Sequence, residues 1–499
     1  MLLALLAAAL EQPGAPCEST HAGDFHAQSC QGWCHAKLIN HAGQPVVLQG
    51  VNMYLEWYRN AYAAVRSGSS ALDIPHLRRA VPAANTIRFV GLLWKDSIKS
   101  SDGLECSTDD PSTGYFDEEC MRFIDSLITQ ATEAGLWVIL TARAKYAAGW
   151  DPPEAQNDVW SDPKLKHMYY EMWRHVARRF RWTDRIAGYE IMSEPRTKTE
   201  SQASVRDFIR GACEVVHSED PGALCVVGPR PYYKLWELTE DVLQPTGSNT
   251  LYTFDFFVPK TFVMSDTDKE SKRDCAQGEN CEGAMFPALY PCREVYETWW
   301  HGKPGCQDGD SMVDVNARWI KEILQKYAFD FGRKHGVPVY CNQWGVKDEV
   351  LEANGRLRYA EAVLDAFTDL GIASTYWIWR SYTKGGRDVH EPVWGFELAH
   401  NDGPHEALDG AMLTTLQAGF LRTGRKYPAS LDPCGAQLAS VNASFAVTPL
   451  NASILAKRIS LAQPTSLRFA PTPLPHSGVQ DAYPKRLHAY LVWITRTVQ

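Results

Sequence analysis

The stretch Val339-Tyr340-Cys341-Asn342-Gln343-Trp344-Gly345-Val346 is typical of a buried strand in a parallel α/β sheet, because apolar and β-branched residues flank a short polar step. A helical segment comes before it and ends near Gly336, where a helix C-terminal glycine is expected. The apolar face of that segment comprises Ile320, Ile323, Leu324, Tyr327 and Phe331. The stretch therefore belongs to a helix–strand unit.

The same alternation of strand-like runs and helical segments begins at about residue 46. Eight strand candidates can be counted, at residues 46–52, 85–90, 136–141, 186–192, 224–227, 250–257, 337–342 and 372–379. The helix predicted between the third and fourth has one apolar face, formed by Leu165, Met168, Tyr169, Met172, Trp173, Val176 and Phe180. Eight units predict a (β/α)8 TIM barrel, and a doubly wound sheet is the alternative.

The composition narrows the class of partner. The chain has 499 residues and a formal net charge of -9, without a long run of one sign. Neither nucleic acid nor a membrane surface is therefore expected as a partner, and no cofactor is indicated. Seventeen Trp residues suit sugar faces, on which aromatic rings stack, although core packing explains most single Trp residues.

The N-terminal residues and the cysteines predict an exported protein. Residues 1–16 open with an apolar, Ala-rich run and resemble a secretory signal, so we expect a secreted monomer. Most of the thirteen Cys are then expected in disulfides. Zinc is the rival interpretation, but no paired Cys-x-x-Cys spacing supports a metal site.

Three regions are expected along the chain after the signal. The barrel occupies residues 17–430 and contains a Cys-rich insertion from about 264 to 309, which is too long for an ordinary βα loop. We expect this insertion to form a disulfide-stapled flap over the cleft. Residues 431–499 lose periodicity and gain Pro and Ser, which predicts either a short tail module or a poorly ordered C-terminal extension.

The predicted fourth strand ends in a carboxylate. It runs into Tyr189-Glu190-Ile191-Met192-Ser193-Glu194-Pro195, and the proline favours an extended exit directly after Glu194. Side chains at the C-terminal ends of barrel strands point to the active-site mouth. Glycoside cleavage needs two groups that flank the bond. The equivalent position on the seventh strand is Gln343, and the pairing of these two positions makes Glu194 a stronger candidate for a catalytic group.

These motifs together resemble glycoside hydrolase family 5, the cellulase and mannanase family of retaining barrel enzymes. The family's Asn-Glu-Pro is matched by Ser193-Glu194-Pro195, which implies that Glu194 is the general acid/base. The family's strand-two arginine is matched by Arg88 and its strand-eight tryptophan by Trp377. Its strand-seven Glu-aromatic-Gly is matched in frame by Gln343-Trp344-Gly345, so the nucleophile position holds an amide.

The departures from the family pattern cluster in the same site. The strand-three histidine has no counterpart in 140–144, and the strand-six His-x-Tyr becomes Asp255-Phe256-Phe257. The tyrosine hydroxyl that orients a carboxylate nucleophile is thus lost together with the nucleophile. An amide can bind a sugar but cannot attack an anomeric carbon as a carboxylate does. We therefore interpret the active site as one in which several residues have changed together.

Several other side chains are candidates for sugar contact or support. Trp377 and Trp379 share a face if strand period two continues, so one or both form a sugar platform or pack in the barrel. Arg88 either orients the residue at 343, contacts a sugar hydroxyl or makes a buried ion pair. Asp255 either replaces the base that activates water, or is a partner of Arg88 or Arg143.

Three functions follow from these residues. The first is hydrolysis of O-glycosidic bonds in a β-linked polysaccharide or glycoconjugate, with Glu194 as acid/base and without the usual carboxylate nucleophile. This hydrolysis would proceed by inversion, or with help from a 2-acetamido group of the substrate. The second is a carbohydrate-binding pseudoenzyme. The third, a scaffold, gives no reason to keep Glu194, Arg88 and the Trp pair.

Overall fold

Eight parallel strands close into a barrel in a computed structural model, which describes residues 25–28, 36–54, 74–93, 110–116, 118–143, 159–160, 162–183, 185–195, 200–244, 249–264, 284–296, 302–350, 352–380, 395–400 and 407–425. The strands are β4 (Gln49–Tyr54), β5 (Thr86–Leu93), β6 (Trp137–Arg143), β7 (Ile186–Glu190), β8 (Cys225–Val227), β9 (Thr250–Phe256), β12 (Val339–Trp344) and β13 (Ala373–Tyr376). The first and last of them, β4 and β13, pair with each other. The predicted (β/α)8 barrel is confirmed, because a doubly wound sheet would leave these edges open.

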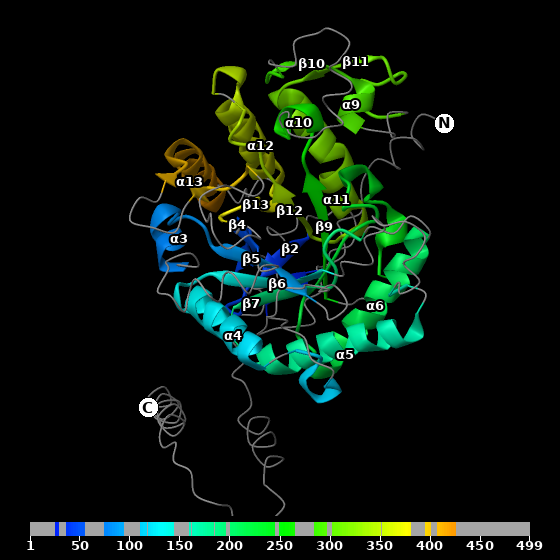
Figure 1. The fold of residues 1–499 in the computed structure, drawn as a ribbon. Coiled ribbons are helices and arrows are strands. Elements are labelled where there is room, and N and C mark those ends of the chain that lie inside the picture. The colour runs from blue at the N-terminus through cyan, green and yellow to red at the C-terminus, as the bar shows by residue number, and fades with distance from the viewer. Residues whose placement is uncertain are drawn as a thin grey trace, which may run out of the picture. The chain divides into compact units, whose positions relative to one another are not determined.

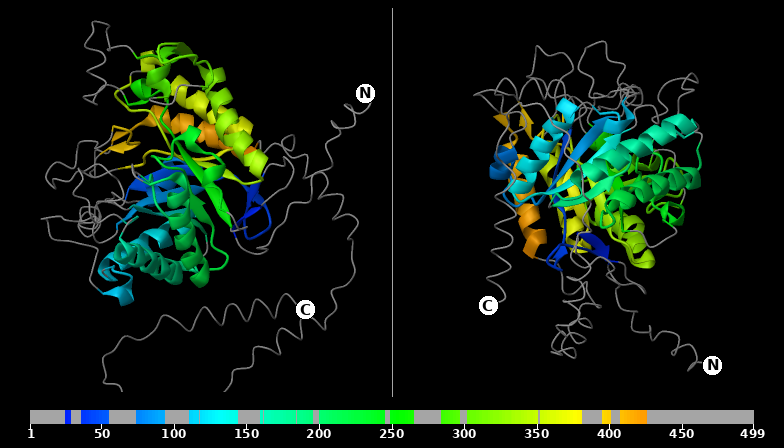
Figure 2. Two further views of the ribbon diagram at one scale, coloured as in Figure 1. Left: turned by 90° about the vertical axis from the view of Figure 1, so that its right-hand side faces the viewer. Right: turned by 90° about the horizontal axis from the view of Figure 1, so that it is seen from below.

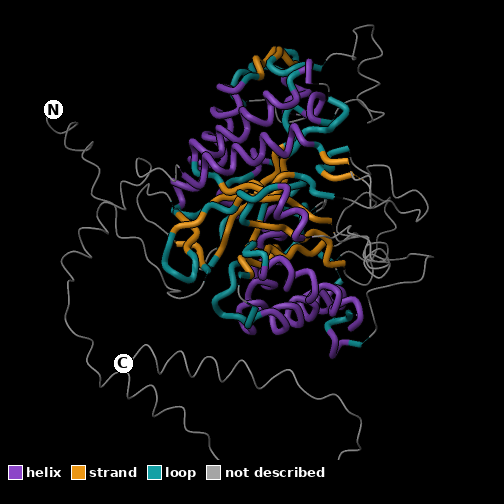
Figure 3. The backbone as a smooth tube through the Cα atoms, turned by 90° about the vertical axis from the view of Figure 1, so that its left-hand side faces the viewer, coloured by secondary structure: helices purple, strands orange, loops and turns teal. Residues whose placement is uncertain are grey.

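Helices surround the strands, as Figures 1 and 3 show. They are α3 (Ile74–Ala80), α4 (Glu118–Glu133), α5 (Pro163–Phe180), α6 (Gln202–Glu219), α10 (Ala317–Leu324), α11 (Asp330–His335), α12 (Arg356–Leu370) and α13 (Gly410–Arg425). A π-helical turn, Gln325–Phe329, joins α10 to α11. After β8 the described chain forms 3-10 turns, Leu235–Glu237 and Glu240–Val242, where the alternating pattern predicted a helix.

The predicted helix faces and stops agree with the structure. In α5 all seven residues of the expected apolar face are buried. Its start is fixed by Asp162, which accepts hydrogen bonds from the backbone N–H groups of residues 164 and 165, and by Pro163 in the first turn. Gly336 and Gly371 end α11 and α12 with φ of 62° and 64°, a left-handed conformation that glycine adopts without a steric penalty.

The barrel is closed at the end where its strands begin. An apolar layer fills the interior there, and its members include Leu48, Ile139, Leu224, Leu251 and Ala373. A small antiparallel sheet of β1 (His26–Gln28), β2 (Lys37–Ile39) and β3 (Pro45–Val46) covers this layer, with Phe25 and Leu38 packed into it. Figure 2 shows this sheet in dark blue at one end of the strands. Function is therefore expected at the opposite end.

The Cys-rich insertion is stapled by a disulfide, as predicted. It contains β10 (Ala288–Pro291), α9 (Cys292–Tyr296) and β11 (Met312–Val315), and Cys292 is bonded to Cys306. Figure 1 places these elements beside α10, at the rim of the helical layer. Residues 265–283 and 297–301 of the predicted flap lie outside the described residues, so its position over the cleft stays a prediction.

Some of the remaining features were predicted from the sequence and others were not. A second disulfide, Cys213–Cys225, joins α6 to β8 and was not predicted from the sequence. The short elements α7 (Lys260–Val263), β14 (Ala399–His400) and β15 (Ala407–Leu408) complete the described fold. None of the helices described here combines the length and the apolar character needed to cross a membrane. The signal at 1–16 and the extension at 431–499 lie outside the described residues and stay predictions.

Candidate active site

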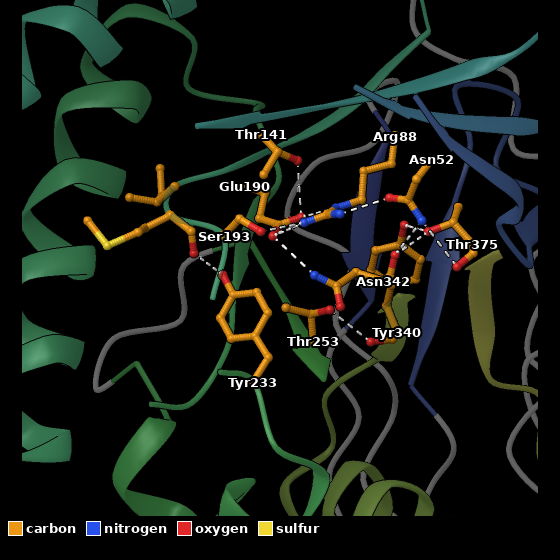
Figure 4. Close-up of polar contacts among 12 residues, drawn as sticks. Asn52, Arg88, Thr141, Glu190, Ser193, Tyr233, Thr253, Tyr340, Asn342 and Thr375 are labelled. Carbon is orange, nitrogen blue, oxygen red and sulfur yellow. Dashed lines mark hydrogen bonds and ion pairs between the residues drawn. The ribbon is translucent and has the colours of Figure 1, made fainter. Parts of the chain in front are cut away.

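A buried ion pair crosses the interior of the barrel (Figure 4). Arg88 of β5 and Glu190 of β7 both have an exposed side-chain fraction of 0%. Two parallel hydrogen bonds join them, from Nε to Oε2 and from Nη2 to Oε1, and each is 2.6 Å long. Burial lowers the pKa of Arg88, but the charge and the hydrogen bonds of Glu190 outweigh it and hold the pKa above its usual value. Arg88 therefore stays charged.

Four neutral side chains complete the hydrogen bonding of this pair. The guanidinium also donates to Asn52 Oδ1 at 2.8 Å and to Ser193 Oγ at 3.0 Å. The carboxylate also accepts from Thr141 Oγ1 at 3.2 Å and from Asn342 Nδ2 at 3.1 Å. Two buried charges are tolerated in a barrel interior when each is paired and hydrogen-bonded in this way. Of the three interpretations of Arg88, the buried ion pair is the one observed.

The chain that leaves β7 is held by side chains from neighbouring elements. Tyr169 and Trp173 of α5 both donate to the carbonyl of Ile191, the latter from Nε1 at 3.1 Å. The hydroxyl of Tyr233, which follows β8, donates to the carbonyl of Met192. Three buried rings from two elements thus fix two consecutive peptide groups. The direction of the next residues is set by these bonds.

Glu194 stands at the end of this fixed segment. Ser193 before it is anchored by its N–H, which donates to the Ala142 carbonyl at 2.8 Å, and by its hydroxyl, which accepts from Arg88. Glu194 itself has φ of 47°, a left-handed conformation that a residue with a Cβ rarely adopts unless its surroundings impose it. Its side chain is partly exposed. The ion pair and Glu194 are therefore linked through Ser193.

Asp255 of β9 lies near Glu194. Burial raises the pKa of Asp255 well above its usual value, as do the charge and the hydrogen bond of Glu194, whereas the charge of Arg88 opposes the shift. The Oδ1 atom of Asp255 is buried and meets no hydrogen-bond donor in the part of the chain that the structure describes. A carboxyl in such surroundings is favoured in its protonated form.

The observed contacts revise what the sequence predicted for Asp255. Arg88 gives its two parallel hydrogen bonds to Glu190, so Asp255 is not its partner. The side chain of Arg143, the other expected partner, lies outside the described residues. The third expectation, a water-activating base, stays a prediction.

Gln343 is aimed into the barrel by an irregularity in β12. The register with β9 pairs Cys341 with Phe254 and then Gln343 with Asp255, so Asn342 is the extra residue of a bulge. Paired residues of neighbouring parallel strands point to the same side of a sheet. Gln343 therefore lies on the same inner side as Asp255, and its exposed fraction is 4%. The bulge also allows the preceding amide, that of Asn342, to reach the ion pair.

The two candidate tryptophans do not share a face. β13 ends at Tyr376, so strand period two does not extend to them. Trp377 packs in a small cluster with Val90, Ile378 and Phe396 at the barrel mouth. Trp379 is 1% exposed and belongs to the core between barrel and helices, with its ring edge-on to His76 of α3. A sugar platform is therefore compatible with Trp377, and packing explains Trp379.

Sequence reasoning missed four residues of the polar layer, Glu190, Asn52, Thr141 and Asn342. A signal for the first was present, because a buried arginine needs a buried acid and Glu190 has the inward phase of β7. Asn52 donates to the carbonyls of residues 342, 375 and 376, and thereby ties β4 to β12 and β13. The bulge that turns Asn342 inward leaves no mark in the sequence. Within the described ranges no cluster of side chains suited to a metal ion occurs.

Comparison with known proteins agrees with this geometry. The chain belongs to glycosyl hydrolase family 5, the cellulase family, whose model matches residues 39–383. It is therefore a member of a family of glycoside hydrolases. A comparison with curated proteins gives no match.

Solved structures of related fold include several bacterial proteins. A broad-specificity endoglucanase from Clostridium cellulovorans has 12% identity and a TM-score of 0.51, and the match covers 75% of this chain and 94% of that one. Subunit Z of the cellulose synthase from Clostridioides difficile has 18% identity and a TM-score of 0.49, with coverage of 74% and 99%. An endoglucanase from Thermotoga maritima has 16% identity, a TM-score of 0.49 and coverage of 74% and 96%. Identities this low show the fold alone.

The ion pair leads to a prediction on stability. Glu190→Gln leaves the buried guanidinium of Arg88 without its countercharge, so we expect the free energy of unfolding to fall by about 3–5 kcal/mol in urea titrations. Asp369→Asn is the matched control, because it breaks the exposed pair Lys321–Asp369, which is 2.8 Å long. That loss should stay below about 1 kcal/mol. Equal losses in the two variants would contradict the role given to the buried pair.

Proposed function

We propose that the chain is a secreted monomer that hydrolyses O-glycosidic bonds of a β-linked polysaccharide or glycoconjugate, with Glu194 as the general acid/base. The observation that carries this proposal is the anchored segment after β7, which ends in a partly exposed carboxyl at the mouth of the barrel. Membership of family 5 supports the class of reaction. A positioned acid of this kind contributes about 10²–10⁴-fold to a rate.

The other half of the usual mechanism is missing. A retaining glycosidase of this family forms a glycosyl ester with a carboxylate on strand seven. The matching residue here is Gln343, whose amide oxygen is a poor nucleophile and whose amide hydrogens can only donate. The attacking group must therefore come from water or from the substrate.

The proximity of Asp255 to Glu194 argues against direct inversion through Asp255. An inverting enzyme keeps its two carboxyls roughly 6.5–9.5 Å apart, which leaves room for a water molecule on the far face of the sugar. The influence of Glu194 on the pKa of Asp255, through its charge and a hydrogen bond, supports a shorter separation than this. The geometry therefore favours a nucleophile supplied by the substrate.

A 2-acetamido group can act as that nucleophile. Its carbonyl oxygen attacks the anomeric carbon, the bond to the departing oxygen breaks, and Glu194 gives that oxygen its proton. Water then attacks the same carbon, the ring formed with the acetamido group reopens, and the carboxylate of Glu194 takes the proton from the water. Gln343 would hydrogen-bond the acetamido group during both steps, a role for which an amide is suited.

A second candidate function is carbohydrate binding without turnover. It is favoured by Gln343 itself together with the lost strand-three histidine and strand-six tyrosine. A pseudoenzyme of this kind would bind oligosaccharides saturably and release no reducing ends. The variant at Glu194 separates the two functions.

Glu194→Gln is expected to lower the rate of reducing-end release by about 10²-fold or more, because the amide cannot donate a proton to the departing oxygen. Binding of the same oligosaccharide, measured by calorimetry, should change little. The control is Glu349→Gln, an exposed glutamate that follows β12 and should leave both unchanged. Full activity of the Glu194 variant would eliminate the proposed role. Binding without turnover in the wild type would establish the pseudoenzyme.

The substrate's own contribution can be tested with paired sugars. Chito-oligosaccharides carry the 2-acetamido group, and cello-oligosaccharides of equal length carry a hydroxyl in its place. We expect hydrolysis of the first series only, with NMR showing that the released sugar keeps its β configuration. Equal rates on both series, or release of the inverted sugar, would overturn substrate assistance.

A further inference from the structure

Asn342 is fully buried beside the ion pair, and both its side chain and its backbone carbonyl are held there (Figure 4). Its Nδ2 donates to Glu190 Oε1 at 3.1 Å, the same oxygen that accepts from Arg88 Nη2. Its backbone carbonyl accepts from Asn52 Nδ2 at 3.0 Å and from Thr375 Oγ1 at 2.7 Å. Three hydrogen bonds to residues of β4, β7 and β13 therefore fix this one residue of β12.

The orientation of the Asn342 side chain follows from the charge of its partner. A carboxylate that is paired with a guanidinium only accepts hydrogen bonds, so the NH2 end of the amide must face Glu190 and the oxygen must face away. That oxygen, Oδ1, is buried and has no donor among the described residues. A buried acceptor without a donor costs stability. The amide is therefore held at its N–H end, and its other end gains no bond from this placement.

The bulge in β12 decides which side chain faces the cleft. The register with β9 and the register with β13 both shift after Cys341. Cys341 is in register with Phe254, and both belong to the core between barrel and helices, whereas Gln343 is in register with Asp255. Without the bulge, position 342 would pair with Asp255 and Gln343 would point outward, since side chains alternate along a strand. Gln343 therefore faces the cleft because Asn342 occupies the bulge.

The same ion pair holds the residues that precede both site positions. Its guanidinium donates to Ser193 Oγ at 3.0 Å, and its carboxylate accepts from Asn342 Nδ2 at 3.1 Å. Glu194 and Gln343 are the next residues in the chain. A displacement of Asn342 would pass through a single peptide unit to Gln343, and an error of about 1 Å is enough to impair a catalytic group.

We propose that Asn342 is the positioning residue of Gln343. Its hydrogen bonds to the polar layer hold the bulge, and the bulge turns Gln343 toward the sugar. Asn342 touches no substrate in this arrangement and acts through its neighbour, so it sets the affinity for the 2-acetamido group. The inference rests on the proposed function only for the identity of that sugar.

The orientation of Gln343 can be tested without a sugar. In NMR spectra of the chain labelled at glutamine nitrogen, the side-chain amide signal of Gln343 is the one that disappears in Gln343→Ala. We expect this signal to move toward that of an exposed glutamine in Asn342→Ala, which lacks the bond to Glu190. Asn316→Ala is the matched control, because it removes the N-cap hydrogen bond of α10 and should leave the signal in place.

A second pair of variants keeps the test decisive if Asn342→Ala does not fold. Thr375→Val keeps the shape of the side chain but removes a donor to the Asn342 carbonyl, so it should also move the Gln343 signal. Thr375→Ser keeps the hydroxyl and should restore the wild-type position. An unmoved signal in the variants that fold would overturn the inference.

Affinity for a chito-oligosaccharide, measured by calorimetry, shows whether Asn342 acts through Gln343. We expect Asn342→Ala and Gln343→Ala each to weaken binding about tenfold, and the double variant to bind no more weakly than Gln343→Ala alone. Losses that multiply in the double variant would contradict the positioning role. If the wild type binds no chito-oligosaccharide, the proposed substrate is wrong and the amide signal decides the role of Asn342. Loss of turnover in Glu194→Gln with an unmoved Gln343 signal would leave the hydrolase standing and remove only this inference.

Discussion

The bidentate ion pair of Arg88 and Glu190 is the interaction on which the site depends. It joins β5 to β7 inside the barrel. Its guanidinium donates to Asn52 and Ser193, and its carboxylate accepts from Asn342. The apolar layer and the small sheet close one end of the barrel, so this polar layer lies between that closed end and the mouth. Glu194 and Gln343 each directly follow a residue of this layer, Ser193 and Asn342. The ion pair thus supports the site and takes no part in the proposed chemistry.

The placement of charge distinguishes this chain from the pattern of its family. The acid Glu194 is kept and anchored through Ser193, whereas the position on strand seven carries the neutral Gln343. A carboxyl, Asp255, occurs on the adjacent strand in register with that amide and near the acid. The second acidic side chain of the site therefore lies on β9, whereas the family pattern has it on the neighbouring seventh strand.

The sequence predicted the barrel well, because apolar periodicity and glycine stops report strands and helices directly, as in α5 and at Gly336. It also predicted which strand ends carry Glu194 and Gln343, since residue order fixes their place around a closed barrel. It did not predict the partner of Asp255 or the separate faces of Trp377 and Trp379. Those depend on a bulge in β12 and on the point where β13 ends, which are set by packing between strands.

The most direct test of this change in the position of the acidic side chain is the stability of Gln343→Glu, alone and combined with Asp255→Asn. Added alone, the new carboxylate joins two others, so we expect its melting temperature to fall below that of the wild type increasingly between about pH 5 and about pH 8. In the combined variant, where position 255 no longer carries a carboxyl, most of that loss should disappear. A loss of equal size with Asp or Asn at position 255 would contradict the account.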